Sequence, residues 1–201
     1  MKPAAAASAP CAVAIGASAG GLPALTQVLA DLPADLAAAV LIVLHMHRQS
    51  PSLLPHLLAR DVTMTVDAAR EGVLLEAGHV YVAVPDLHFG TLERRVHLTD
   101  QPLVHYTRPS IDHLFESVAT AWGPRAIGVL LTGCGSDGAA GVAAIKRAGG
   151  TTIVQDPRDA SFAAMPRAAL ATGCVDRTLR LRVIGDAITR TVAALGPYAA
   201  A

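Results

Sequence analysis

The sequence predicts an α/β fold, with a doubly wound, mostly parallel sheet flanked by helices and an antiparallel hairpin region at one edge. Three continuous apolar runs, residues 11–15, 38–44 and 126–131, have the composition of strands that are covered on both faces. A polar or glycine-rich loop follows each run, and a helical pattern begins after each loop. Strands that alternate with helices favour parallel pairing through right-handed crossovers.

Length and composition fit one domain with a large core. The chain has 201 residues, of which 52% are hydrophobic and 16% are charged, and its formal net charge is zero. This balance does not indicate nucleic acid or an anionic membrane surface as a partner. The three cysteines are odd in number and widely spaced, so we expect no disulfide framework, no zinc site and a reducing, cytoplasmic environment.

We expect residues 1–9 to form a flexible tail and residues 10–197 to form the domain. The alanine-rich start resembles a secretion signal, but Pro3 and Pro10 interrupt it. Cleavage at the usual length of about 15–30 residues would also remove the first glycine turn. No apolar run reaches the roughly 18 residues needed to span a membrane, so we expect no membrane insertion.

Local signals define the remaining elements. Pro23 suits the first turn of a helix that Pro33 ends, and Ser50 and Ser110 are suitable N-caps. The segment with residues 80–84 and 94–99 alternates in polarity, which predicts short strands or hairpins at the edge of the sheet. The further elements expected are strands over residues 62–66 and 151–155 and helices over residues 22–32, 50–60, 111–122, 139–148, 166–173 and 183–195.

The first strand leads into a glycine turn that carries one hydroxyl group. Gly16, Ser18 and Gly20 have the spacing of a nucleophile elbow, in which a serine lies between a strand and a helix. The helix N-terminus offers free N–H groups that can stabilise an oxyanion. The same turn could instead bind a phosphate or nucleotide, or Ser18 could only cap the helix.

Two further reactive groups follow the other buried strands. His45 ends the second apolar run, and Asp137 lies in the glycine loop after the third. Because working groups gather at the carboxyl ends of parallel strands, we expect Ser18, His45 and Asp137 to meet as nucleophile, base and orienting acid. The N–H groups of Ala19 and Cys134 are the candidates for the oxyanion site. The chain order Ser, His, Asp differs from that of α/β-hydrolases.

These residues resemble the catalytic domain of the CheB-type chemotaxis protein-glutamate methylesterase family. The resemblance runs from about residue 11 to residue 176 and is carried by several motifs. They are Ile15-Gly16-Ala17-Ser18-x-Gly20-Gly21, His45-Met46, Gly78-x-Val80-Tyr81-Val82-Ala83, Arg108-Pro109-Ser110-Ile111-Asp112, Leu131-Thr132-Gly133-x-Gly135-x-Asp137-Gly138-Ala139-x-Gly141 and Met165-Pro166-Arg167.

The resemblance implies hydrolysis of glutamyl γ-methyl esters on methylated chemoreceptor helices, and deamidation of receptor glutamines, without a metal or organic cofactor. It also implies the triad roles of Ser18, His45 and Asp137. This sequence has Cys134 where family members commonly have methionine, Ala19 where threonine is common, and residues 47–50 in place of a proline-glycine stretch. Only residues 1–10 precede the first predicted strand, so we expect no receiver domain and a separate response regulator or signalling partner.

Other interpretations of these residues stay open. The chain could be an interaction domain that binds receptors without turnover, or a phosphate- or nucleotide-binding module. His45 and His47 could begin a metal site, although a third ligand is missing. Arg108 and Arg167 could hold loops at the active edge or meet an acidic receptor helix. The scattered histidines are interpreted as surface or edge residues: His56, His79, His88, His97, His105 and His113.

Overall fold

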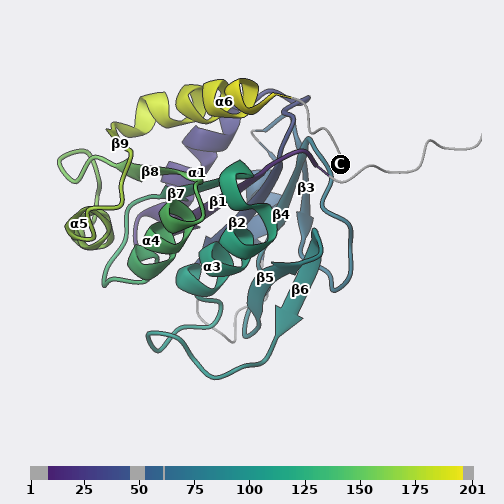
Figure 1. Cartoon of the computed structure of the whole chain (residues 1–201), viewed down its shortest axis with the longest axis horizontal. Coiled ribbons are helices and arrows are strands. Elements are labelled where there is room, and N and C mark those ends of the chain that lie inside the picture. The colour runs from purple at the N-terminus through teal and green to yellow at the C-terminus, as the bar shows by residue number, and fades with distance from the viewer. Residues whose placement is uncertain (1–8, 46–52, 61, 197–201) are drawn as a thin grey trace, which may run out of the picture.

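The computed structural model, which describes residues 9–45, 53–60 and 62–196, contains a seven-stranded sheet in the order β3-β4-β2-β1-β7-β8-β9. Every neighbouring pair in this sheet is parallel, and helices cover both of its faces (Figure 1). The predicted fold class is therefore confirmed. The strands of the sheet are β1 (Ala12–Ala17), β2 (Ala39–Leu44), β3 (Thr65–Ala68), β4 (His79–Val82), β7 (Ala126–Leu130), β8 (Thr151–Gln155) and β9 (Arg177–Leu179).

The remaining elements surround this sheet. A two-stranded antiparallel hairpin, β5 (His88–Leu92) with β6 (Arg95–Thr99), lies beside α3 (Figure 1). The helices are α1 (Gly21–Ala30), α2 (Leu54–Leu58), α3 (Ile111–Trp122), α4 (Ala139–Arg147), α5 (Ala164–Ala171) and α6 (Ile184–Leu195), with short 3-10 turns η1 (Gly123–Arg125) and η2 (Leu181–Val183). None of the described helices is long and apolar enough to cross a membrane.

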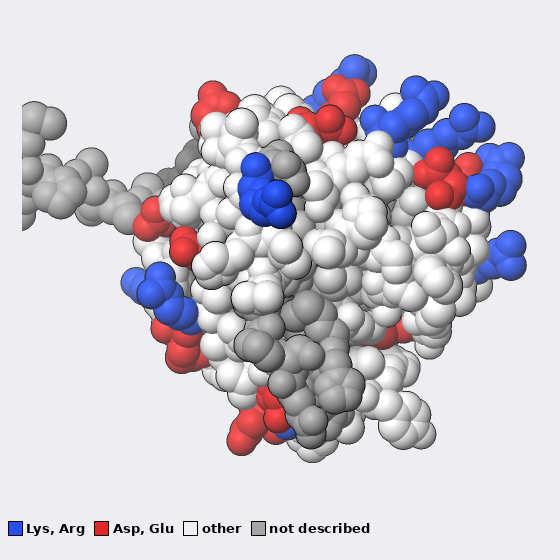
Figure 2. Space-filling model, turned by 180° about the vertical axis from the view of Figure 1, so that it is seen from behind, with Lys and Arg blue, Asp and Glu red and all other residues white. Residues whose placement is uncertain are grey.

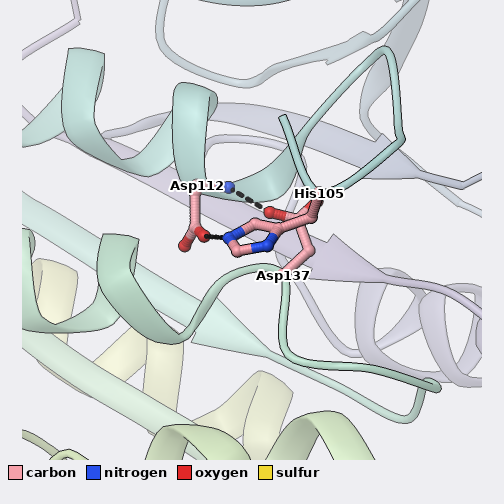
Figure 3. Close-up of side chains that lie close together, drawn as sticks. All are labelled: His105, Asp112 and Asp137. Carbon is pink, nitrogen blue, oxygen red and sulfur yellow. Dashed lines mark hydrogen bonds and ion pairs between the residues drawn. The ribbon is translucent and has the colours of Figure 1, made fainter. Parts of the chain in front are cut away.

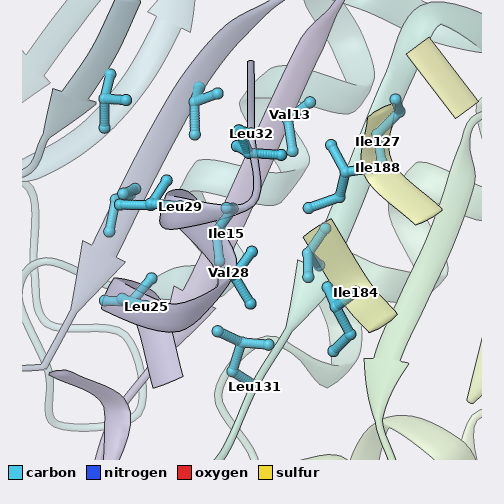
Figure 4. Packing of buried hydrophobic residues seen from close by; sticks show 14 of the residues in the cluster. Val13, Ile15, Leu25, Val28, Leu29, Leu32, Ile127, Leu131, Ile184 and Ile188 are labelled. Atoms are coloured by element: carbon cyan, nitrogen blue, oxygen red, sulfur yellow. The ribbon is translucent and has the colours of Figure 1, made fainter. Parts of the chain in front are cut away.

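The alternation of side chains along the central strands divides the core into two layers. Val13 and Ile15 of β1 face the layer that contains α1 and α6, where they join Val28 and Ile188 (Figure 4). The intervening alanines of β1 face α3 and α4. Burial on both sides explains why β1, β2 and β7 are apolar without interruption.

A close contact between β1 and α3 sets the position of the α3 N-terminus. A Cβ atom added to Gly16 would come within 2.3 Å of Ile111 Cγ2, so only glycine allows this approach. Ser110 caps α3, as predicted, by accepting a hydrogen bond from the N–H of His113 at 3.4 Å. The first turn of α3 therefore lies against the carboxyl end of β1.

The middle and the end of the chain differ from the prediction in three places. β4 is not an edge hairpin strand but lies between β3 and β2 in the parallel sheet, because Val80 and Val82 pack into the main core. The hairpin that does form, β5–β6, is a separate two-stranded sheet. The short edge strand β9 was not predicted, since arginine and threonine make up most of it. The predicted cap Ser50 lies outside the described residues.

The described part of the chain begins inside the predicted tail, at Ala9. Ala9 is buried and donates a backbone hydrogen bond to the carbonyl oxygen of Leu75 at 2.8 Å, whereas residues 1–8 lie outside the described part. On the rear face, basic side chains gather at one upper corner and most of the remaining surface is uncharged (Figure 2). No extended basic stripe crosses this face, in agreement with the zero net charge.

Candidate active site

The Ser18 turn connects β1 to α1 with the geometry that its glycines allow. Gly20 has a φ of 72°, in the left-handed region, and is the N-cap residue of α1. No side chain caps this helix, so Ser18 does not serve as the helix-capping serine. The N–H of Ser18 donates to the carbonyl oxygen of Thr132 at 3.0 Å, which ties the turn to the loop after β7.

The loop after β7 comes very close to Ser18. A Cβ atom added to Gly133 would lie 2.8 Å from Ser18 Cβ and 2.1 Å from Met165 Sδ. Thr132 Oγ1 donates to the carbonyl oxygen of Ala19 at 3.0 Å. Two segments more than 100 residues apart in the sequence are therefore held in direct contact at the carboxyl edge of the sheet.

His45 and Asp137 form a hydrogen-bonded pair at the same edge. His45 follows β2, and its Nε2 lies 2.8 Å from Asp137 Oδ2. The His45 side chain is 15% exposed and that of Asp137 is 4% exposed, so water has little access to the contact. The structure thus brings together His45 and Asp137, and the turn that carries the third predicted residue, Ser18, lies against the loop that carries Asp137.

The carboxylate of Asp137 is bound by the N-terminus of α3. Oδ1 accepts hydrogen bonds from Ser110 Oγ and from the N–H of Asp112, both at 2.9 Å, and Oδ2 accepts from the N–H of Ile111 at 2.8 Å. Free N–H groups and the positive end of the helix dipole favour an anion at this position. Sequence analysis missed this arrangement, because the donors lie about 25 residues before Asp137.

These contacts determine the charge of Asp137. Burial raises the pKa of its carboxyl, but the hydrogen bond from His45 and the N–H groups of Asp112 and Ile111 outweigh burial and lower the pKa to about 2. Asp137 is therefore an anion at neutral pH. A fixed anion next to Nε2 of His45 holds the proton on that nitrogen and leaves Nδ1 as the basic nitrogen.

The buried side chain of His88 forms a hydrogen bond with the N-terminus of α3. His88, at the start of β5, is fully buried, which corrects its interpretation as a surface or edge residue. Its Nδ1 accepts from the N–H of Ser110 at 3.3 Å, and its Nε2 donates to the carbonyl oxygen of Pro102 at 3.0 Å. His113 stacks on its ring at 4.7 Å, and burial lowers the pKa of His113. A lone histidine in a short strand gave no sequence signal for this role.

Two backbone N–H groups are available where an oxyanion site is expected. Within the described part of the chain, the N–H groups of Ala19 and Cys134 have no protein acceptor. Cys134 is exposed and lies in the loop that approaches Ser18. Unpaired N–H groups at the mouth of a site are suited to a developing negative charge on oxygen.

A cavity of about 270 Å³ opens beside these groups. Its walls include both members of the His45–Asp137 pair, together with the loop of Cys134 and a second loop that carries His105 and Thr107. His105 therefore lines the site, although the sequence interpretation placed it on the surface or at an edge. Ser18 and Ala19 are not among the residues that line this cavity.

Three groups that metals favour also lie together here. Ligand atoms of His105, Asp112 and Asp137 are within 4.8 Å of one another (Figure 3). Both oxygens of Asp137 already accept hydrogen bonds from the protein, so a cation would have to displace those donors. These contacts favour a hydrogen-bonded network. His47, the other histidine considered as a metal ligand, lies outside the described residues.

Arg108 serves to hold loops at this edge. Its guanidinium group bonds Asp86 Oδ1 at 2.8 Å and the carbonyl oxygens of Asp100 and Gln101 at 2.6 and 3.0 Å. It therefore fixes the segment that leads to the α3 N-terminus.

Comparison with known proteins places this arrangement in a family. A CheB methylesterase model matches residues 13–188. Protein-glutamate methylesterase/protein-glutamine glutaminase of Symbiobacterium thermophilum is 42% identical over 181 residues, which cover 90% of this chain and 50% of that protein. A relative from Cupriavidus pinatubonensis is 40% identical over 186 residues, covering 92% of this chain and 54% of the relative. The chain therefore spans about half the length of these curated relatives.

A solved structure agrees with this assignment. The Thermotoga maritima CheB methylesterase catalytic domain superposes with a TM-score of 0.86 at 28% sequence identity, covering 90% of this chain and 97% of that one. Fold, family model and relatives lead to the same conclusion, which is that the chain belongs to the CheB methylesterase family.

Proposed function

We propose that the chain is a serine hydrolase that cleaves glutamyl γ-methyl esters on methyl-accepting chemoreceptors, in chemotaxis adaptation or a related signalling process. The observation that carries this proposal is the 2.8 Å bond between His45 and Asp137 at the sheet edge where the Ser18 turn lies. The relatives are named as methylesterases of protein glutamate and glutaminases of protein glutamine, and we take the ester and the glutamine as substrates from them.

In this mechanism Ser18 is the nucleophile and His45 is the base. Because Asp137 engages Nε2, Nδ1 of His45 takes the proton of Ser18 as Oγ attacks the ester carbonyl. The tetrahedral intermediate expels methoxide, which receives that proton and leaves as methanol. A water molecule, deprotonated by His45, then attacks the acyl-enzyme, and the products are the glutamyl carboxyl group and free Ser18.

The other residues of the site would stabilise the charges that develop on His45 and on the substrate oxygen during the reaction. The anion of Asp137 stabilises the imidazolium that forms on His45. The N–H groups of Ala19 and Cys134 would bind the oxyanion, and replacing methionine by cysteine at this position leaves the backbone donor intact. Deamidation of a glutamine would follow the same course, with ammonia in place of methanol.

The proposal also names partners. The substrate partner is the methylated cytoplasmic helix of a chemoreceptor, and the regulatory partner is a response-regulator domain or another signalling protein. A phosphate- or nucleotide-binding role is less well supported, because the side chain of Ile111 fills the space beside Gly16 that a ligand would need. An interaction domain without turnover would not require the low pKa of Asp137.

Methanol release from a methylated chemoreceptor fragment tests the proposal. The parent protein should release methanol, Ser18→Ala should not, and Thr120→Ala, at an exposed hydroxyl on α3, should behave like the parent. Full release by a folded Ser18→Ala protein would contradict the serine mechanism. Binding of the fragment without any release by the parent would favour the interaction domain.

A further inference from the structure

A tight turn at residues 104–107 borders the cavity and has an uncommon backbone. Val104 and Thr107 exchange backbone hydrogen bonds of 3.2 and 2.9 Å, and the two residues between them, His105 and Tyr106, have φ values of 49° and 62°. Two successive non-glycine residues in the left-handed region are costly. Such strain persists only where the surroundings enforce it.

Another turn of this kind shows why the 104–107 turn is different. Glu93 and Arg94 also have positive φ values, but they join β5 to β6, and the twist of a hairpin favours that conformation. The 104–107 turn joins no strands, since its ends form only an isolated bridge. Its conformation is maintained by the hydrogen bonds between Val104 and Thr107 and by contacts with the rest of the site.

Those contacts come from the two carboxylates of the site. His105 Nε2 lies 3.1 Å from Asp112 Oδ2, as Figure 3 shows. The Asp112 side chain is 4% exposed, its Oδ1 accepts from the N–H of Gly141 at 2.7 Å, and its Oδ2 accepts no hydrogen bond from the described residues, so its contact with His105 is an ion-pair contact and not a hydrogen bond. The Thr107 hydroxyl donates to the carbonyl oxygen of Val104 at 2.8 Å, within the turn, and its Oγ1 also lies 3.3 Å from Asp137 Oδ2. The turn is thus held by its own hydrogen bonds and by the contact of His105 with Asp112.

The turn places the aromatic side chain of Tyr106 at the mouth of the cavity. Tyr106 is 93% exposed and lines the same cavity as His45 and Asp137. At about 270 Å³ the cavity takes an ester side chain but not the polypeptide that carries it. Contacts with that polypeptide must therefore come from the rim, where a tyrosine offers a large and rigid apolar surface.

We propose that Tyr106 determines specificity by packing against the receptor segment next to the scissile ester, and that the His105–Asp112 pair is the positioning element that holds it there. The inference rests on the proposed function and deepens it, since it assigns recognition of the polypeptide to a part of the chain that takes no part in bond cleavage.

The test separates binding from chemistry. Tyr106→Asn removes the ring and keeps a residue that tolerates a left-handed backbone. We expect KM for a methylated receptor fragment to rise about five- to thirtyfold, the size of one lost contact of ordinary strength, with kcat unchanged. Hydrolysis of a small ester such as p-nitrophenyl acetate should not change. The matched control is Leu92→Ala, which removes a side chain that is 60% exposed at the far end of β5.

His105→Gly tests the positioning pair, because glycine accepts the backbone conformation but cannot reach Asp112. It should raise KM for the receptor fragment by the same factor as Tyr106→Asn does. KM of the double variant, with Tyr106→Asn and His105→Gly together, should be no higher than KM of either single variant. Both changes act through one contact. Additive effects would overturn the role of the pair.

The outcomes distinguish this inference from the proposed function. An active parent with an unchanged KM in Tyr106→Asn would overturn the inference alone. A parent that hydrolyses neither the receptor fragment nor the small ester would overturn the proposed function, and the inference with it.

Discussion

Nε2 of His45 lies 2.8 Å from Oδ2 of Asp137, and this contact determines which nitrogen of the imidazole is basic. Asp137 is in turn held by Ser110 and by the first N–H groups of α3. The imidazole of His45 is therefore oriented by a helix N-terminus through a carboxylate. The predictions below examine the parts of this arrangement one at a time.

Asp137→Asn should abolish most activity and also lower stability, because the amide nitrogen would face donors from which a carboxylate oxygen now accepts. The amide has no charge to stabilise the imidazolium and favours the wrong tautomer of His45, so we expect kcat to fall about 10⁴-fold. Methanol release and a thermal unfolding curve measure the two effects. A folded Asp137→Asn protein with parental kcat would show that His45 does not depend on this carboxylate.

Asp137 should also make stability depend on pH. Its folded pKa of about 2 lies below the ordinary value of 3.8, so its contribution is present above about pH 4 and is lost as the pH falls through 2. The size expected from such a shift is about 2–3 kcal/mol. Urea unfolding of the parent and of Asp137→Asn at pH 6 and pH 2.5 measures it, and the difference between the two proteins should shrink at the lower pH.

Asp112 contributes with the opposite sign, because burial raises its pKa. Its contribution to stability is present below the ordinary pKa and declines as the pH rises. The charge of Asp137 also raises the pKa of Asp112, so Asp137→Asn should weaken this opposing contribution as well. A stability difference that is independent of pH would contradict the charged state assigned to Asp137.

Ser110 should act as a positioning residue. Ser110→Gly removes the hydroxyl that donates to Asp137 Oδ1, whereas glycine is nearly as good an N-cap as serine. Losing a hydrogen bond to a charged group should lower kcat about 10- to 100-fold with a small change in stability. The pH profile of kcat should shift as well, and Ser110→Thr, which keeps the hydroxyl, should restore the parental profile. An unaltered profile in Ser110→Gly would limit Ser110 to helix capping.

Gly16→Ala should destabilise the fold. The new methyl group would come within 2.3 Å of Ile111 Cγ2, and overpacking of this kind costs about 1–3 kcal/mol. Combining it with Ile111→Ala should recover part of the loss, since the two changes compensate in volume. Denaturant unfolding of the two single variants and the double variant measures this coupling, and simple additivity would contradict the contact.

Sequence patterns predicted those elements of the fold that have a strong local signal, such as a continuous apolar run. The uninterrupted apolar runs at β1, β2 and β7 reflect burial on both faces, and the polar groups after them mark one edge of the sheet. β9 was not predicted because a strand of three residues, Arg177–Leu179, is too short to show a strand pattern. β4 was placed wrongly, since its alternation is also typical of a hairpin.

Only those residues of the candidate site that directly follow a buried strand could be predicted from the sequence. Ser18, His45 and Asp137 follow buried strands, whereas Ser110 and His105 lie on the long segment between β6 and α3, where no periodicity indicates what they face. Their roles depend on contacts across the fold, such as the approach of α3 that Gly16 permits. Such contacts have no signature in local sequence.

Mapping the covalent adduct of a serine-reactive fluorophosphonate tests the central claim most directly. The account predicts one adduct on Ser18, with parallel loss of methanol release, and much slower labelling in His45→Ala. The exposed Cys134 is the rival nucleophile in the same site. Loss of activity with the adduct on another residue, or retained activity after complete labelling of Ser18, would contradict the account.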